Sequence, residues 1–148
     1  MVQIGWAEQL AGAAPSFRGG FGKLVRRDSA GCLHFQTSGQ LYLIFMHVII
    51  WEFTVRVEHI EEFVRAYGSN GDWASLFRLA EGFLGTQLLR SCHDAGVFLT
   101  VDRWENATSF EMFQERFTAE YEELDARLEG YTLAERKVGV FEGELPIL

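Results

Sequence analysis

The amino-acid sequence predicts an α+β fold with a four-stranded antiparallel sheet. Four segments are predicted to be strands, and in the first and third of them apolar residues alternate with the period of two that a strand requires. Between them, apolar residues recur at steps of three and four, which places them on one face of a helix. The chain has 148 residues, 48% of them hydrophobic, so its length fits a single domain with a substantial core.

The regular pattern starts at Met46 with a long strand and two short helices. Apolar and polar residues alternate from His47 to Val57, which predicts the first strand. From Glu58 to Tyr67 the spacing becomes helical. Ser69-Asn70-Gly71 interrupts this helix, and Asp72 is expected to cap a second one.

A hairpin is predicted next. Gly82 to Arg90 has strand character, and so does Val97 to Trp104, in which Val97, Leu99 and Val101 supply the alternating apolar positions. The turn residues Asp94-Ala95-Gly96 join the two segments, so they are expected to pair as antiparallel neighbours.

The rest of the pattern is a long helix and a last strand. Asn106 is expected to cap a helix from Ala107 to Leu128, and Gly130 to end it in a left-handed conformation. Leu133 to Phe141 is the predicted fourth strand. The buried stripe of the helix is expected to consist of Phe110, Phe113, Phe117, Tyr121, Leu124 and Leu128.

Strand, helix, strand, strand, helix, strand is the ferredoxin-like order β-α-β-β-α-β, which puts both helical segments on one face of the sheet. A face left to water should be polar. Val48 and Ile50 are apolar, yet they lie on the opposite side of the first strand from Ile49 and Trp51. The open face is therefore expected to pack against a second copy of the chain in a homodimer.

Residues 46–142 are predicted to form the ordered domain. Residues 1–45 hold seven of the 15 glycines and keep no strand or helix period for long, so a flexible or non-native N-terminal extension is expected there. Translation that begins at Met46 would explain the change in pattern. Residues 143–148 contain Pro146 and are expected to be a loose tail.

The net charge of −8 argues against nucleic acid as a partner, because binding phosphates requires a basic surface. The longest apolar run, Leu41 to Trp51, is too short to cross a membrane. Cys32 and Cys92 have no metal-ligand spacing and are expected to be reduced, which favours a cytoplasmic protein. No metal site is expected from the histidine spacing.

Three motifs together suggest a family. They are the strand Ile49 to Glu58 followed by a helix, Trp104-Glu105-Asn106 followed by Phe110 and Phe113, and Glu120-Tyr121 followed by the strand Glu135 to Phe141. In their order and spacing, residues 46–142 resemble the antibiotic biosynthesis monooxygenase (ABM) domain of the dimeric α+β barrel superfamily. This resemblance implies a small homodimer with one pocket per subunit, between the sheet and its helices.

The resemblance also implies a chemistry. Characterised relatives oxygenate quinols or aromatic polyketides with dioxygen and without metal or flavin, and one branch degrades heme. That branch has a ligand His in the long helix about ten residues after the Trp, where this chain has Gln114. It also has an Asn on the first strand, which is missing here and which often serves quinol oxygenation as a polar anchor. These two differences argue against heme, and the resemblance to the cofactor-free relatives implies that no other cofactor is used.

The candidate site follows from the same residues. Trp104 is expected to wall a pocket and donate its indole N–H to a substrate carbonyl, and Tyr121 to orient a ring oxygen. His47 would serve as a base if it points inward. Asp102 is expected to pair with Arg103 or Arg90 at the sheet surface. The expected substrate-binding residues are Tyr67, Trp73, Phe110 and Phe113.

Each of these aromatic residues also has a plainer interpretation as part of the core that covers the sheet. Two functions therefore stay open. The first is a cofactor-independent monooxygenase that acts on a quinol or another hydroxylated aromatic or polyketide. The second is a non-catalytic dimeric protein that binds a small aromatic ligand in the same pocket.

Overall fold

A computed structural model of the chain describes residues 45–144. The predicted N-terminal extension therefore lies outside the described residues, apart from Phe45. The elements follow in the order β1 (Phe45–Val55), a 3-10 turn (Val57–His59), α1 (Ile60–Tyr67), α2 (Asp72–Phe77), β2 (Phe83–Arg90), β3 (Val97–Trp104), α3 (Ala107–Arg116), α4 (Thr118–Leu128), a second 3-10 turn (Glu129–Tyr131) and β4 (Thr132–Glu144).

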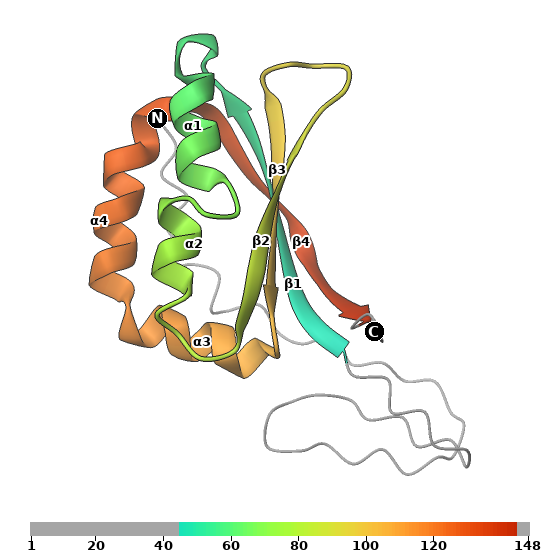
Figure 1. The fold of residues 1–148 in the computed structure, drawn as a ribbon, viewed down its shortest axis with the longest axis vertical. Coiled ribbons are helices and arrows are strands. Elements are labelled where there is room, and N and C mark those ends of the chain that lie inside the picture. The colour runs from blue at the N-terminus through green and yellow to red at the C-terminus, as the bar shows by residue number, and fades with distance from the viewer. Residues whose placement is uncertain (1–44, 145–148) are drawn as a thin grey trace.

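The four strands form one antiparallel sheet in the order β2-β3-β1-β4. Figure 1 shows the helices on one side of this sheet, with α1, α2 and α4 along it and α3 across its lower end. The predicted ferredoxin-like α+β fold is confirmed.

The register decides which side chains lie under the helices. Ile49 of β1 is opposite Asp102 of β3, and Asp102 is opposite Thr86 of β2. Because successive side chains of a strand point to opposite faces, the even-numbered residues of β3 lie on the helix side. The core there is built from aromatic rings, and its fully buried members include Phe63, Phe98, Trp104 and Phe113.

The last strand is longer than predicted. β4 runs from Thr132 to Glu144, so Gly143 and Glu144, expected in a loose tail, belong to the sheet. They pair with Met46 and Phe45 of β1. Apolar and polar residues do not alternate clearly over Gly143 and Glu144, so the sequence alone does not predict a strand there. The pairing with β1 keeps these residues extended. Residues 145–148 lie outside the described part of the chain.

The predicted long helix is wrong in one respect, because it is two helices. Phe117 leaves the helical conformation with φ −114° and ψ 27°. Its ring stacks on Phe113 with centroids 5.6 Å apart, and the Thr118 hydroxyl donates to the Gln114 carbonyl at 2.6 Å. Such back-bonding to the preceding turn bends helices. The bend lets α3 and α4 follow different parts of the twisted sheet.

Two expected caps also differ. Gly130 lies in the 3-10 turn after α4, and among the described glycines only Gly82 and Gly85 have positive φ. The helix therefore ends without a left-handed residue. Asp72 does not cap α2, because Gly71 occupies the N-cap position. The Asp72 carboxylate instead accepts a hydrogen bond from Arg127 at 3.0 Å, which connects α2 to α4.

The cap predicted for α3 is confirmed. The Asn106 side chain accepts from the backbone N–H of Ser109 at 2.8 Å, and the Ser109 hydroxyl donates to the same oxygen at 3.2 Å. This fixes the start of α3 directly after β3. Among residues 45–144, none of the helices combines the length and the apolar character that crossing a bilayer demands.

We expect Asn106→Ala to lower the free energy of unfolding by about 1 kcal/mol, because the variant leaves an N–H group of the first turn without its acceptor. Asn106→Asp keeps an acceptor at the same place and should be close to the wild type. Urea denaturation measures both. An alanine variant as stable as the wild type would show that the cap contributes nothing.

Candidate functional site

A cavity of about 50 Å³ lies between the sheet and the helices that cover it. All four strands contribute to its lining, and so do α1, α2, α3 and α4. A water molecule needs roughly 10–15 Å³ of such space, whereas a cavity that holds benzene has about 150 Å³. The described conformation therefore has room for a few waters, and an aromatic ligand requires the surrounding rings to move apart.

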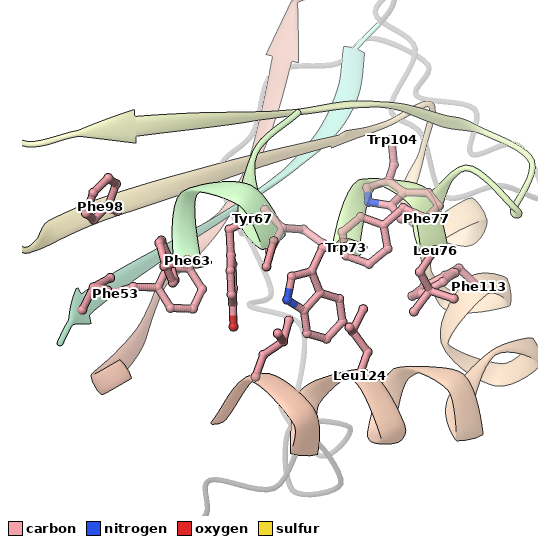
Figure 2. Packing of buried hydrophobic residues seen from close by; sticks show 14 residues of the cluster. Phe53, Phe63, Tyr67, Trp73, Leu76, Phe77, Phe98, Trp104, Phe113 and Leu124 are labelled. Atoms are coloured by element: carbon pink, nitrogen blue, oxygen red, sulfur yellow. The ribbon is translucent and has the colours of Figure 1, made fainter. Parts of the chain in front are cut away.

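One wall of the cavity is aromatic and comes from the helices. Tyr67, at the end of α1, stacks on Phe63 with ring centroids 4.1 Å apart. Trp73 of α2 contacts Tyr67 at 6.1 Å and Tyr121 of α4 at 4.8 Å. Figure 2 shows Trp73 between α2 and the helix that carries Leu124. Tyr67 and Trp73 lie on either side of the break between α1 and α2, which are the two shortest α-helices of the described residues.

Trp104 closes the cavity at the end of β3. Its side chain is 0% exposed and contacts Phe77, Phe83, Phe110 and Phe113 with ring centroids 5.1–5.7 Å apart. Figure 2 shows Trp104 with its ring beside Phe77. It is therefore part of the core as well as of the cavity wall.

Two polar atoms on this wall have no partner. Within the described residues, the indole Nε1 atoms of Trp73 and Trp104 are buried and donate no hydrogen bond of good geometry, although Trp73 lies near enough to the Tyr67 hydroxyl to act against the rise of its pKa. A buried donor without an acceptor costs about 1–3 kcal/mol. Both residues line the cavity, so an acceptor oxygen of a ligand would relieve this cost.

The charged group of the cavity is Asp102, whose side chain is 8% exposed. The hydroxyl of Thr86 on β2 donates to its Oδ1 at 2.6 Å. Burial raises the pKa of this carboxyl from its ordinary 3.8 to about 6, although the Thr86 and Thr100 hydroxyls and the Arg103 charge act in the opposite direction. At neutral pH the cavity therefore holds a carboxylate that is ready to take a proton.

The expected pairing of Asp102 with Arg103 or Arg90 at the surface is wrong. Arg103 donates to Gln87 at 2.8 Å on the other side of the sheet, and Arg90 donates to the Ala95 carbonyl at 3.2 Å. The sequence contains a signal for the correct side. Asp102 lies two residues before Trp104 on the same strand, and such residues point to the same face of the sheet. If Trp104 is in the core, the Asp102 side chain must also point toward the helices.

Two more carboxyl groups lie at the edge of the cavity, Asp125 of α4 and Glu135 of β4. Partial burial raises the pKa of each, and the Asp125 charge raises that of Glu135 further. Burial and these nearby charges also raise the pKa values of Tyr67 and Tyr121 well above the ordinary range. Both phenol groups therefore stay protonated and can donate a hydrogen bond to a ligand.

The structure brings most of the predicted site residues together. Those that line the cavity are Tyr67, Trp73, Trp104, Phe110 and Tyr121. Phe113 lies in the core against Trp104 and is 1% exposed. His47 packs beside Phe110 at 6.0 Å and is not part of the lining. Partial burial lowers the pKa of His47, so its ring is neutral at pH 7.

Other reactive groups lie away from the cavity. Cys92 is an exposed free thiol in the β2–β3 hairpin, and Cys32 lies outside the described residues. Within residues 45–144, no three His, Cys, Asp or Glu side chains are grouped as metal ligands would be.

The family model described as antibiotic biosynthesis monooxygenase matches residues 46–129, more than half of the chain. Nothing among curated proteins matches this sequence. The match begins one residue after the start of β1 and ends just after α4, so it includes nearly all of the cavity lining.

Solved structures support the same fold. A protein from Deinococcus radiodurans, assigned to the antibiotic biosynthesis monooxygenases, has a TM-score of 0.55 at 14% identity, over 69% of this chain and 96% of its own. SnoaB, a cofactor-independent oxygenase from Streptomyces nogalater, has a TM-score of 0.52 at 17% identity, over 70% and 97%. A protein from Nitrosomonas europaea with the same assignment as the first has 0.53 at 16%, over 70% and 94%. At these identities the likeness concerns the fold alone.

We expect Asp102 to make the stability of the fold depend on pH. The folded state keeps the proton of this carboxyl up to about pH 6, whereas the unfolded chain releases it near 3.8. The stability that the group contributes is therefore complete below pH 3.8 and is lost as the pH rises to about 6. The loss amounts to about 3 kcal/mol.

Asp102→Asn removes this titration, so its stability relative to the wild type should increase by about that amount as the pH rises from 3.5 to 7. Urea unfolding at a series of pH values measures the difference. Asp72→Asn, which removes an exposed carboxylate, is the matched control. A difference between the wild type and Asp102→Asn that does not change with pH would mean that Asp102 is solvated.

Proposed function

The chain belongs to the antibiotic biosynthesis monooxygenase family, and on this premise we propose that it oxygenates a quinol or another hydroxylated aromatic or polyketide without a cofactor. The observation that carries the proposal is a single aromatic cavity. Its lining includes the indole N–H groups of Trp73 and Trp104, which donate no hydrogen bond, and the buried carboxylate of Asp102. Aromatic rings suit an aromatic ligand, the N–H groups suit its oxygen atoms, and the carboxylate suits its acidic proton.

The reaction balances without an added reductant. A quinol ring that gains one oxygen atom and becomes a hydroxyquinone gives up four electrons, and dioxygen accepts all four. One of its oxygen atoms enters the product and the other leaves as water, together with two hydrogens from the substrate. The protein must therefore bind the ring, favour its anion over the neutral form, and keep bulk water away.

The cavity residues suit these tasks. The Trp104 Nε1 atom would donate to a substrate oxygen, where negative charge builds up once the ring is deprotonated. The protonated Tyr121 hydroxyl would orient a second oxygen. Tyr67 and Trp73 would stack on the ring and exclude water, and they flank the break between α1 and α2, where movement would admit the ligand.

A second candidate is a non-catalytic protein that binds an aromatic ligand. The neutral Tyr67 and Tyr121 hydroxyls favour it, since they recognise oxygen atoms and are not bases at neutral pH. Oxygen consumption separates the two functions.

We expect the protein to consume dioxygen with at least one member of a panel of quinols and anthrones. Trp104→Phe keeps a ring in the core but removes the N–H, so kcat/KM should fall about tenfold or more. Phe113→Leu, which loosens the same contact without removing a donor, is the control and should lose much less. An oxygen electrode and product analysis measure all three proteins.

Two results would contradict the oxygenase proposal. Quenching of tryptophan fluorescence by the panel without any oxygen consumption would leave the binding protein. Neither quenching nor consumption would argue against both functions.

We also infer that the functional unit is a homodimer joined through the open face of the sheet. This face has an apolar centre: Val48 and Ile50 on β1, Leu99 and Val101 on β3, Leu89 on β2 and Phe141 on β4. Phe141 is 47% exposed and Leu89 40%, Ile50 and Leu99 are half-buried, and Val48 and Val101 are only 7% and 9% exposed. A patch of this kind on one sheet face favours an identical partner, because a two-fold axis lets the same surface cover itself.

Ile50→Lys should convert the dimer into a monomer, because each copy would place an ammonium group in the centre of the interface. Val57→Lys, at a position that is 80% exposed and outside the sheet, is the control and should stay dimeric. Sedimentation velocity at micromolar concentration distinguishes them. A wild type that sediments as a monomer there would end the proposal.

A further inference from the structure

The proposed oxygenation needs a group that accepts the proton of the substrate. Tyr67 and Tyr121 stay protonated at neutral pH, and His47 lies outside the cavity lining. The described lining contains three carboxyl groups, those of Asp102, Asp125 and Glu135. The base must therefore be sought among the carboxyls, and they differ in position.

We propose that Asp102 is the general base that removes the proton from the substrate hydroxyl, and that Thr86 is a residue that positions it. The proposal rests on the oxygenase function proposed above. Asp102 is a catalytic residue in this scheme because it touches the reacting atom, whereas Thr86 acts through the carboxylate.

Position separates Asp102 from the other two carboxyls. Asp102 is on a central strand and 8% exposed, so bulk water does not compete for it. Glu135 lies on the edge strand β4, where it is only partly covered and more exposed than Asp102, and it accepts from the Thr132 hydroxyl at 2.8 Å. Asp125 is half-buried on α4. A proton taken up by either of these exchanges with solvent instead of staying beside the substrate.

The immediate surroundings of Asp102 leave it able to act. Thr86 donates to Oδ1 at 2.6 Å, which holds the carboxylate against β2. A carboxylate has about four lone-pair sites, so acceptor capacity remains for a substrate hydroxyl. Trp104 is two residues further along β3 and faces the same side. The donor for one substrate oxygen and the acceptor for the proton of another thus lie on one rigid strand.

The proton transfer leaves the net charge of the cavity unchanged. The substrate O–H bond breaks, a new O–H bond forms at the Asp102 carboxylate, and the negative charge moves to the substrate ring. The ring anion then passes electrons to dioxygen. The proton held by Asp102 goes to the oxygen atom that leaves as water, which restores the carboxylate.

The pH dependence follows from the charges around the group. The titratable side chains that line the cavity beside Asp102 are Tyr67 on α1, Tyr121 and Asp125 on α4 and Glu135 on β4. Further away on the same side lie His47 on β1, Glu111 on α3, and Lys137 and Glu142 on β4, while Arg103 is adjacent on β3. Burial outweighs them and raises the pKa of Asp102 to about 6. A base acts when ionised, so kcat/KM should rise with pH and level off above about 6.

The test compares full-length variants with a quinol that the wild type oxidises. Asp102→Asn keeps the shape and the acceptor for Thr86, and it should lower kcat/KM at least 100-fold and abolish the rise near pH 6. Its affinity for the quinone product should change only a few-fold. Asp72→Asn, with the same chemical change at the surface, should behave as the wild type.

Thr86 has its own readout. Thr86→Val removes a hydrogen bond to the charged form of Asp102, so the rise in kcat/KM should move to higher pH. Thr86→Ser keeps the hydroxyl and should restore the midpoint. A merely structural role for Thr86 would change the rate without moving the midpoint.

The failure of this proposal can be told from that of the oxygenase function. If wild type and Asp102→Asn oxidise the quinol equally, with the same pH profile, Asp102 is not the base although the oxygenase function stands. If no quinol is oxidised, the absorbance spectrum of a quinol bound in the absence of oxygen tests whether Asp102 is a base. A quinol anion that forms on the wild type and not on Asp102→Asn would support Asp102 as the base although the oxygenase function fails. Equal spectra on the two proteins would overturn the proposal.

Discussion

The register of β3 within the sheet determines the chemistry of this protein. β3 pairs with β1 on one side and β2 on the other, and both pairings point its even-numbered residues toward the helices. Phe98 and Trp104 fill the core, and between them Thr100 and Asp102 carry polar groups to the same depth. A shift of the β3 register by one residue would exchange the two faces of the strand. Any register that buries Trp104 under the helices therefore also buries the Asp102 carboxylate there.

This arrangement makes the cavity costly to maintain. An ionised Asp102 is buried at neutral pH, and the Nε1 atoms of Trp73 and Trp104 donate to nothing in the described part of the chain. The surrounding aromatic core offsets these costs by excluding water and holding the side chains in place. Polar groups kept unsatisfied inside a well-packed core are typical of a site that is completed by its ligand.

Much of the fold could be predicted because its signals are local. The bounds of β3 and the cap at Asn106 follow from alternation and from the residue type at the helix start. The bend at Phe117 could not be predicted, because it depends on how α3 and α4 meet a twisted sheet. The end of β4 depends on its pairing with β1, which lies far away in the sequence.

The candidate site was only half accessible to sequence reasoning. The aromatic residues Trp104, Tyr121, Tyr67 and Trp73 stood out by type and spacing, and the structure places them around one cavity. Asp102 was assigned to the surface because a charged residue in a strand is usually solvated. Its true orientation follows from the alternation of side chains along β3: Asp102 and Trp104 are two residues apart, so the Asp102 side chain faces the helices as Trp104 does.

The most direct test of this account is a carbon-13 NMR titration of the Asp102 carboxyl carbon in the full-length chain, assigned with Asp102→Asn. A buried carboxylate in an aromatic cavity should titrate with a midpoint near pH 6. A midpoint below pH 4 would contradict the account, because it would place the carboxyl in water and leave the cavity without its base.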